Sequence, residues 1–109
     1  WFGCDVGKRY NRDLAVMDTK LNDYGLVFGT EPGMSKAERL LHGESLMTHA
    51  MVFTGFDESP TGELRKWRVE NSWSADLGDS GYFVMSDDWF NEFNYQVVVD
   101  KKYLAPEVL

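Results

Sequence analysis

Residues 66–85 read KWRVENSWSADLGDSGYFVM. If the first part of this stretch is a strand, alternation puts four side chains on one face: Trp67, Val69, Asn71 and Trp73. An amide then stands in a row of large apolar side chains, although asparagine is a poor strand former. A buried amide needs hydrogen-bond partners. Asn71 is therefore either part of a structural hydrogen-bond network or the residue that orients a catalytic histidine.

The chain offers two histidines, His42 and His49. His49 lies early in a run of apolar and small residues at 46–57, and both faces of that run suit a strand that is covered on both sides. A lone histidine in such a strand is either a core residue satisfied by a backbone carbonyl or a catalytic base. His42 lies near the end of a short helix, where a cation is favoured, so a structural role is the simpler interpretation.

Further apolar runs predict further strands, separated by loops rich in glycine, serine and aspartate. We expect strands over residues 1–6, 46–57, 66–73, 82–86 and 94–104. This spacing favours an antiparallel, β-rich, barrel-like sheet with short helices to one side, which is an α+β architecture.

Two short helices are predicted beside the sheet. Ser35 and Glu38 have the spacing of a capping box, and Gly43 is a typical helix end. Residues 87–93 have the pattern of one helical turn, whereas residues 8–25 are mixed and polar and are expected to be irregular. The 109 residues are expected to form a single segment of one domain.

Composition excludes several classes of function. The net charge is −7 and there is no lysine- or arginine-rich run, so a nucleic-acid surface is not supported. No apolar run approaches the ~20 residues of a membrane span. One cysteine excludes an internal disulfide and favours a reducing compartment. Two separated histidines and one cysteine match no metal-ligand spacing, so no metal or other cofactor is expected.

Cys4 is the only thiol and a poor candidate for a nucleophile. It lies within an apolar strand and precedes Asp5, and an adjacent carboxylate raises a thiol pKa. We expect an inert, buried Cys4. The sequence contains no Gly-x-Ser-x-Gly motif, so a serine nucleophile of that kind is not supported. The chain thus offers a base and an orienting residue but no nucleophile, and both of its ends look cut from a longer protein.

Several blocks of the sequence together resemble one enzyme family. THAMVFTGF, KWRVENSW and LGDSGYF resemble the C-terminal half of papain-like cysteine peptidases, in which a His-Ala pair starts a strand and Asn-Ser-Trp ends the next one. The blocks WFGCDVGK, SKAERL, GESLMTHAM, DDWFNEF and VVVDKKY make the chain most similar to the bleomycin hydrolase branch of that family. The resemblance covers nearly the whole chain.

This resemblance implies roles for particular residues. His49 would be the general base that takes the proton of a thiol, Asn71 would orient its ring, and Trp73 would shield their hydrogen bond. Met47 and Ala50 would line the non-primed substrate groove. The nucleophilic cysteine and an oxyanion-hole glutamine would lie upstream, in an N-terminal half that this chain lacks.

The resemblance also implies properties of a complete protein. It would be a cytoplasmic aminopeptidase, cofactor-free and hexameric, that hydrolyses peptide bonds at substrate N-termini, while the 109-residue chain alone would be inactive. Its partners would be peptide substrates, the rest of the same protein and further copies of itself. One departure concerns Ser74, which stands where the family usually has glycine and would be strained if that position has positive φ.

Two other classes of function stay open. The chain could belong to a catalytically dead homologue, or to a non-enzymatic assembly or interaction module, which would display an exposed apolar patch. A redox site at Cys4 is a third possibility, and it requires an accessible thiol that reacts near neutral pH.

Overall fold

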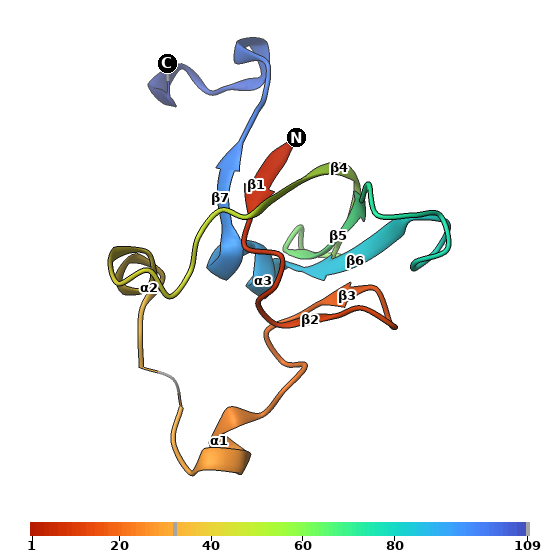
Figure 1. Ribbon diagram of the computed structural model, residues 1–109. Helices are drawn as coiled ribbons and strands as arrows, with labels where there is room; N and C mark the ends of the chain where they lie inside the picture. Colours follow the sequence, from red (N-terminus) through yellow and green to blue (C-terminus); the bar gives the residue numbers. More distant parts are fainter. Residues whose placement is uncertain (32, 109) are drawn as a thin grey trace.

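The computed structural model describes residues 1–31 and 33–108. Its centre is a curled sheet with the strand order β2-β3-β6-β5-β4-β1-β7 (Figure 1). The strands are β1 (Phe2–Cys4), β2 (Tyr10–Asn11), β3 (Val16–Met17), β4 (His49–Glu58), β5 (Leu64–Glu70), β6 (Tyr82–Ser86) and β7 (Asn94–Val97). Few and short helices accompany this sheet, so the predicted α+β architecture is confirmed.

The consecutive strands β4, β5 and β6 form an antiparallel meander that is the backbone of the fold. β4 was expected to be covered on both faces, and this expectation is wrong for most of the strand. Within β4 only Met51 is buried, and Phe56 near the far end is 63% exposed. The outer half of β4 belongs to the β4–β5 hairpin, and its side chains pack mainly against β5, as Phe56 does against Trp67.

Two very short strands join the sheet from a segment that was expected to be irregular. β2 and β3 pair with each other, and β3 then runs parallel to β6, with Val16 beside Val84. The sheet is therefore mixed, whereas the sequence predicted only antiparallel neighbours. A strand of two residues carries no alternation pattern of its own, so its place depends on distant partners.

The core lies where β1, β4, β5 and β6 meet the helix α3 (Asp87–Phe93). Ser86 caps this helix by accepting from the backbone N–H of Trp89. The indole of Trp89 is fully buried, and its Nε1–H donates to the carbonyl oxygen of Lys8 at 2.7 Å. The helix thus ties the first loop of the chain to the sheet.

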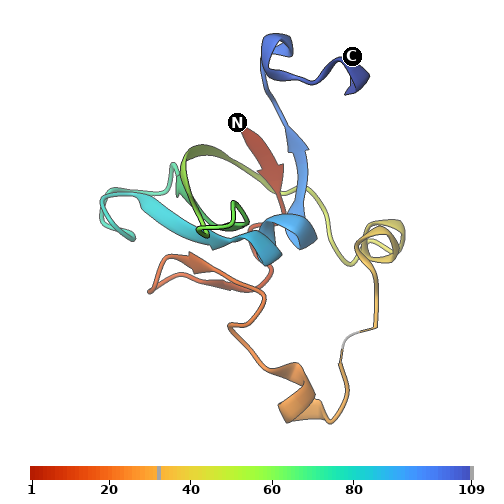
Figure 2. The same ribbon diagram turned by 180° about the vertical axis from the view of Figure 1, so that it is seen from behind.

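The remaining helices are α1 (Tyr24–Phe28) and α2 (Lys36–Leu41), and neither contains a buried residue. The predicted capping box of α2 is present, because Ser35 and Glu38 each accept from the other's backbone N–H. Residues 18–31 and 33–35, here called the arm, carry α1 away from the sheet (Figures 1 and 2). No helix in the described part of the chain is long and apolar enough to cross a bilayer.

The last strand is shorter than predicted. β7 ends at Val97, and the backbone N–H of Val98 still donates to the carbonyl oxygen of Trp1. Asp100 then accepts from the backbone N–H of Lys102 and starts a 3-10 turn, η1 (Lys101–Tyr103), which is followed by η2 (Pro106–Val108). This side-chain cap competes with continued sheet pairing, so the strand pattern over 94–104 is not realised beyond Val97.

Candidate active site

His49 and Asn71 are brought together at one end of the β4–β5 pair. His49 is the first residue of β4, and Asn71 directly follows the last residue of β5. The His49 Nε2 lies 2.8 Å from the Asn71 Oδ1. The two residues are 22 positions apart in sequence, so the hairpin between them creates the contact.

A second hydrogen bond shows which atom donates and which accepts in this contact. The backbone N–H of Ser72 donates to the same Asn71 Oδ1, at 2.8 Å. A backbone N–H can only donate, so the atom facing it must be the amide oxygen. His49 Nε2 must then carry the hydrogen that it donates to that oxygen. In the neutral ring Nδ1 is left with the lone pair, and Nδ1 makes no hydrogen bond within the described part of the chain.

Asn71 and Trp73 were expected inside a strand, and this expectation is wrong. β5 ends at Glu70, and the backbone N–H of Asn71 makes a last contact with the carbonyl oxygen of Gly81. The chain then turns out of the sheet. The side chain of Asn71 is used to cap this turn through Ser72, which explains why a poor strand former stands here.

Trp73 lies against the imidazole ring of His49. The two ring centroids are 4.9 Å apart, with an angle of 36° between the ring planes. The indole is 38% exposed, so it is not an ordinary core residue. Tyr10 and Phe83 support its other side with edge contacts at 5.7 and 6.1 Å. Tyr10 was not among the candidates, since nothing in its local sequence points to a residue so far along the chain.

Met47 and Ala50 line a shallow groove of about 330 Å³ beside His49. Thr48 also lines it, and its other walls come from the two ends of the chain: Trp1, Phe2, Gly3, Gln96 and Val98. A Cβ atom at Gly3 would overlap the sulfur of Met47, so glycine is required there for the Met47 side chain to lie across β1. The two predicted groove residues are therefore adjacent to the histidine and share one apolar hollow with it.

Cys4 is the register partner of His49 in the β1–β4 ladder, which raises the question of a thiol–imidazole pair. The side chain of Cys4 is fully buried. Burial, together with the negative charge of Asp5, raises the pKa of the thiol from 9.0 to about 12. Such a thiol is protonated at neutral pH and inaccessible. The expected burial of Cys4 is confirmed, and it speaks against a redox site there.

Two further expectations can be compared with the geometry. Ser74 does not have positive φ; among the described non-glycine residues only Arg9, Ala15 and Ser80 do, so the serine is not strained there. His42 ends α2 as its C-cap and is exposed. Within residues 1–31 and 33–108, no group of three histidine, cysteine, aspartate or glutamate side chains could hold a metal ion.

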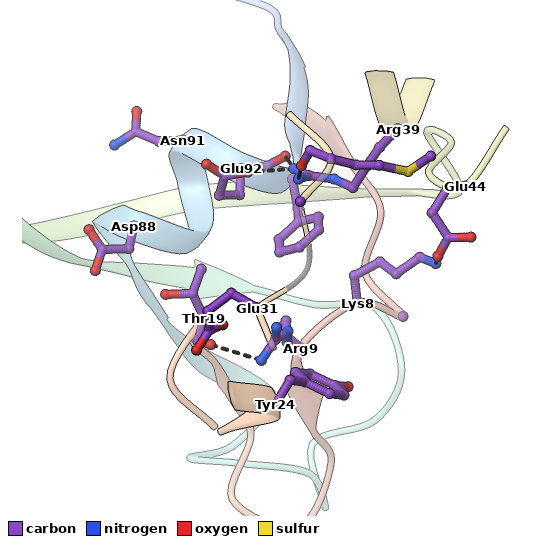
Figure 3. Close-up of a pocket in the computed structure, with 14 residues that line it drawn as sticks. Lys8, Arg9, Thr19, Tyr24, Glu31, Arg39, Glu44, Asp88, Asn91 and Glu92 are labelled. Atoms are coloured by element: carbon purple, nitrogen blue, oxygen red, sulfur yellow. Dashed lines mark hydrogen bonds and ion pairs between the residues drawn. The ribbon is translucent and has the colours of Figure 1, made fainter. Parts of the chain in front are cut away.

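A larger hollow of about 990 Å³ lies between the arm and α3 (Figure 3). Four of its charged side chains pair with one another: Lys8 pairs with Glu44 and Arg39 with Glu92. Arg9 donates to the carbonyl oxygen of Thr19 and lies over the ring of Tyr24. None of the predicted site residues lines this hollow, so it is a separate feature of the arm.

Comparisons with known proteins show the family and the fold of the chain. The family model described as the Peptidase C1-like family matches residues 1–109. Bleomycin hydrolase of Homo sapiens is 55% identical, over 100% of this chain and 25% of that protein. Aminopeptidase C of Listeria monocytogenes is 49% identical, over 100% of this chain and 24% of that protein.

A solved structure is similar over almost the same residues. The crystal structure of PepW from Lactobacillus rhamnosis superposes with a TM-score of 0.93 at 54% identity, covering 99% of this chain and 24% of that one. The chain spans about a quarter of the length of the relatives it matches, as a C-terminal segment of them. Because the family model matches the chain from end to end, this chain belongs to the Peptidase C1-like family.

Proposed function

We propose that this chain supplies the base and the orienting residue of a cysteine peptidase that removes amino acids from the N-termini of peptides. The observation that carries the proposal is the contact between His49 Nε2 and Asn71 Oδ1, with the polarity that Ser72 imposes on it. That polarity leaves the lone pair of Nδ1 as the proton acceptor.

The chemistry follows from the tautomer. A thiol placed at His49 Nδ1 loses its proton to the ring, and the thiolate attacks the carbonyl carbon of the scissile bond. The imidazolium then donates the same proton from Nδ1 to the leaving amine, while Nε2–H stays bound to Asn71. Trp73, which lies against the ring, excludes water from the imidazole–amide contact and keeps that contact strong.

The proposal takes the nucleophile from outside these residues. Cys4 is the chain's single cysteine, and it is buried and protonated at neutral pH. We propose that an upstream cysteine and an oxyanion-hole glutamine of the complete protein fill these roles. The 109-residue chain alone is then inactive, because loss of one triad member costs about three or more orders of magnitude in rate.

The finer parts of the proposal rest on the relatives. Release of N-terminal amino acids is supported by the name aminopeptidase C, and peptide substrates are supported by the groove that Met47 and Ala50 line beside His49. A hexameric, cytoplasmic complete protein is proposed from the family resemblance alone. No cofactor is needed for this chemistry, since thiol, imidazole and amide suffice.

The competing proposal is a catalytically dead homologue or an assembly module that uses this segment as a scaffold. Exposed apolar side chains on α1 and α2, such as Val27 and Leu41, are the observation in its favour. A scaffold, however, has no need for a histidine whose Nε2–H is committed to an amide oxygen. The paired His49 and Asn71 therefore favour the enzyme.

Active-site labelling in the complete protein separates the two proposals. We would treat the protein with a mechanism-based thiol reagent, digest it and map the modified peptide by mass spectrometry. Modification of an upstream cysteine, abolished by His49→Ala, is the expected result. The matched control is His42→Ala, which should leave labelling unchanged because His42 is exposed at the end of α2. A well-folded protein without upstream modification would be a dead homologue.

A further inference from the structure

The buried carboxyl group of Asp5 lies close to the residues that lead into His49, but it takes no part in the proposed proton transfer. Asp5 follows β1 directly and is only 5% exposed. Its Oδ2 accepts from the hydroxyl of Ser45 at 2.7 Å and from the backbone N–H of Leu46 at 3.2 Å. Its Oδ1 lies 3.5 Å from the hydroxyl of Thr48. Each partner is a donor, as an ionised carboxylate requires.

The contacts extend to the last strand of the sheet. The hydroxyl of Ser45, which is 1% exposed, is also 2.5 Å from the hydroxyl of Tyr95 in β7. Because Ser45 donates to Asp5, Tyr95 must be the donor to Ser45. The backbone N–H of Asp5 donates to the carbonyl oxygen of Phe93, at the end of α3. Asp5 thus connects β1, α3 and β7 with one short segment of chain.

That segment leads directly into His49. Residues 45–48 have no regular secondary structure, and they join the end of α2 to the start of β4. The backbone N–H of Thr48 donates to the carbonyl oxygen of Cys4, and Cys4 is the register partner of His49. The contacts to Asp5 therefore add to the β1–β4 ladder in fixing where β4 begins.

We infer that Asp5 is a positioning residue for the proton transfer: its buried carboxylate holds residues 45–48 and so sets where the His49 ring meets Asn71. The inference rests on the proposed function for its catalytic consequence, but the structural statement can be tested separately. Asp5 does not touch the reacting atoms. Its loss moves the ring, and a displacement of about 1 Å in an active site costs up to about a hundredfold in rate.

A pair of serine variants of the complete protein isolates this effect. Ser45→Ala removes the hydroxyl that joins Asp5 to Tyr95. Ser86→Ala removes a hydroxyl that caps α3, at 3.2 Å from the Trp89 N–H, far along the chain from the histidine. Both variants lose one hydrogen-bonding hydroxyl. Only Ser45→Ala is expected to lower kcat, by about tenfold, with Ser86→Ala within twofold of the unchanged protein.

A second pair tests the chemistry of the carboxyl group. Asp5→Ala leaves the Ser45 and Leu46 donors without an acceptor, whereas Asp5→Asn keeps one oxygen for both of them and turns its NH₂ towards the Thr48 hydroxyl, which can accept. Asp5→Asn should therefore retain most of the activity that Asp5→Ala loses. If Asp5→Ala does not fold, Ser45→Ala and Asp5→Asn still decide the question.

Alkylation of the upstream cysteine by iodoacetamide provides a readout that does not use the substrate groove. In the unchanged protein the imidazole favours the thiolate, so alkylation occurs at low pH. In Ser45→Ala the midpoint should move upward, towards the ordinary thiol value of about 8.5, and in Ser86→Ala it should not. Equal effects in the two serine variants, or an Asp5→Ala protein that folds with unchanged kcat and midpoint, would overturn the inference.

Failure of the proposed function would look different. If the unchanged protein neither cleaves peptides nor alkylates upstream, the peptidase proposal falls. Crystal structures of the unchanged protein and of Ser45→Ala then test the positioning role alone. A His49 ring displaced from Asn71 in the variant supports it, and an unmoved ring overturns it.

Discussion

At the start of β4, His49 is held by the ladder to β1, by the amide of Asn71 and by the indole of Trp73. At the tip of the arm, α1 has no buried residue, and Leu26 and Val27 are 83% and 72% exposed. Within the described residues, the side-chain hydrogen bonds that tie the arm to the rest of the chain lie near its two ends, and Arg9 also lies over the ring of Tyr24 in α1. Arg9 donates to the carbonyl oxygens of Thr19 and Asn22 at one end. Just after the other end, Lys36 of α2 donates to the carbonyl oxygens of Asn91 in α3 and of Asn94, which follows it.

The two regions differ in what their polar contacts hold in place. At the site, each polar contact fixes the direction of a side chain that acts on a proton. On the arm, the contacts fix only the backbone where it leaves and rejoins the body, and the apolar side chains between them face solvent within the described residues. Substitutions should therefore affect the rate at the site and the stability in the core beside it, and neither of these on the arm.

The largest contrast is expected between two valines. Val69 is fully buried between Phe53 and Phe83 of the neighbouring strands, so Val69→Asp buries an unpaired carboxylate. We expect it to lower the free energy of unfolding by about 4 kcal/mol or more. Val27→Asp on the arm should change it by less than about 1 kcal/mol. Chemical denaturation of the complete protein measures both, and equal losses would mean that another part of the protein covers the arm.

A smaller change in stability with a large change in rate is expected at Asn71. Asn71→Ala removes the acceptor that holds Nε2–H, so the ring can rotate or change tautomer. We expect kcat to fall by roughly 10²–10⁴-fold, as when a triad loses its orienting residue. The melting temperature should stay close to that of the unchanged protein. Unfolding comparable to that of Val69→Asp would instead make Asn71 a structural residue.

Two tryptophans sharpen the distinction between site and core. Trp73 lies against His49, whereas Trp67 packs on Phe53 and Phe90 and donates from Nε1 to Asp87. Trp73→Ala should reduce kcat by about tenfold by admitting water to the His49–Asn71 contact.

The matched variant Trp67→Ala should act in the opposite way, lowering the melting temperature with little effect on kcat. Peptidase kinetics and thermal unfolding of the two variants test this. A rate loss at Trp67 as large as that at Trp73 would show that general packing, and not shielding, governs the rate.

The smallest effect at neutral pH is expected at Cys4. Its pKa is raised to about 12 by burial and by Asp5, so the thiol stays protonated and should resist alkylation at pH 7. Because the thiol holds its proton more tightly in the folded state, its contribution to stability is fully present below pH 9.0. That contribution is lost as the pH rises from 9.0 to about 12.

The free energy of unfolding should therefore decline in that alkaline range. Cys4→Ala should remove this part of the decline and leave kcat at pH 7 unchanged. Rapid alkylation of Cys4 in the folded protein at pH 7 would contradict the assignment.

Local patterns were sufficient for much of the fold. The capping box at Ser35, the hairpin between β4 and β5, and the helix after Ser86 all lie in short stretches whose spacing determines the structure. The meeting of His49 and Asn71 also follows from a hairpin, because adjacent strands bring the start of one beside the end of the next.

The sequence could not predict features that depend on distant partners. Alternation continued to Trp73, but the ladder ends at Glu70, where Asn71 and Gly81 make the last contact. β2 and β3 are too short to have a pattern, and the role of Asp5 depends on Ser45, 40 residues away. The one local signal is an aspartate directly after an apolar strand, and it does not identify the partners of that aspartate.

The parallel pairing of β3 with β6 also affects the order of events during synthesis. Val16 leaves the ribosome about 70 residues before its partner Val84, which at 5–20 residues per second is a wait of roughly 3–14 s. The β4–β5–β6 meander needs no such wait, because its strands are consecutive. β3 can therefore pair with β6 only after residues 82–86 have emerged, and until then its unpaired edge is available to chaperones and to other nascent chains.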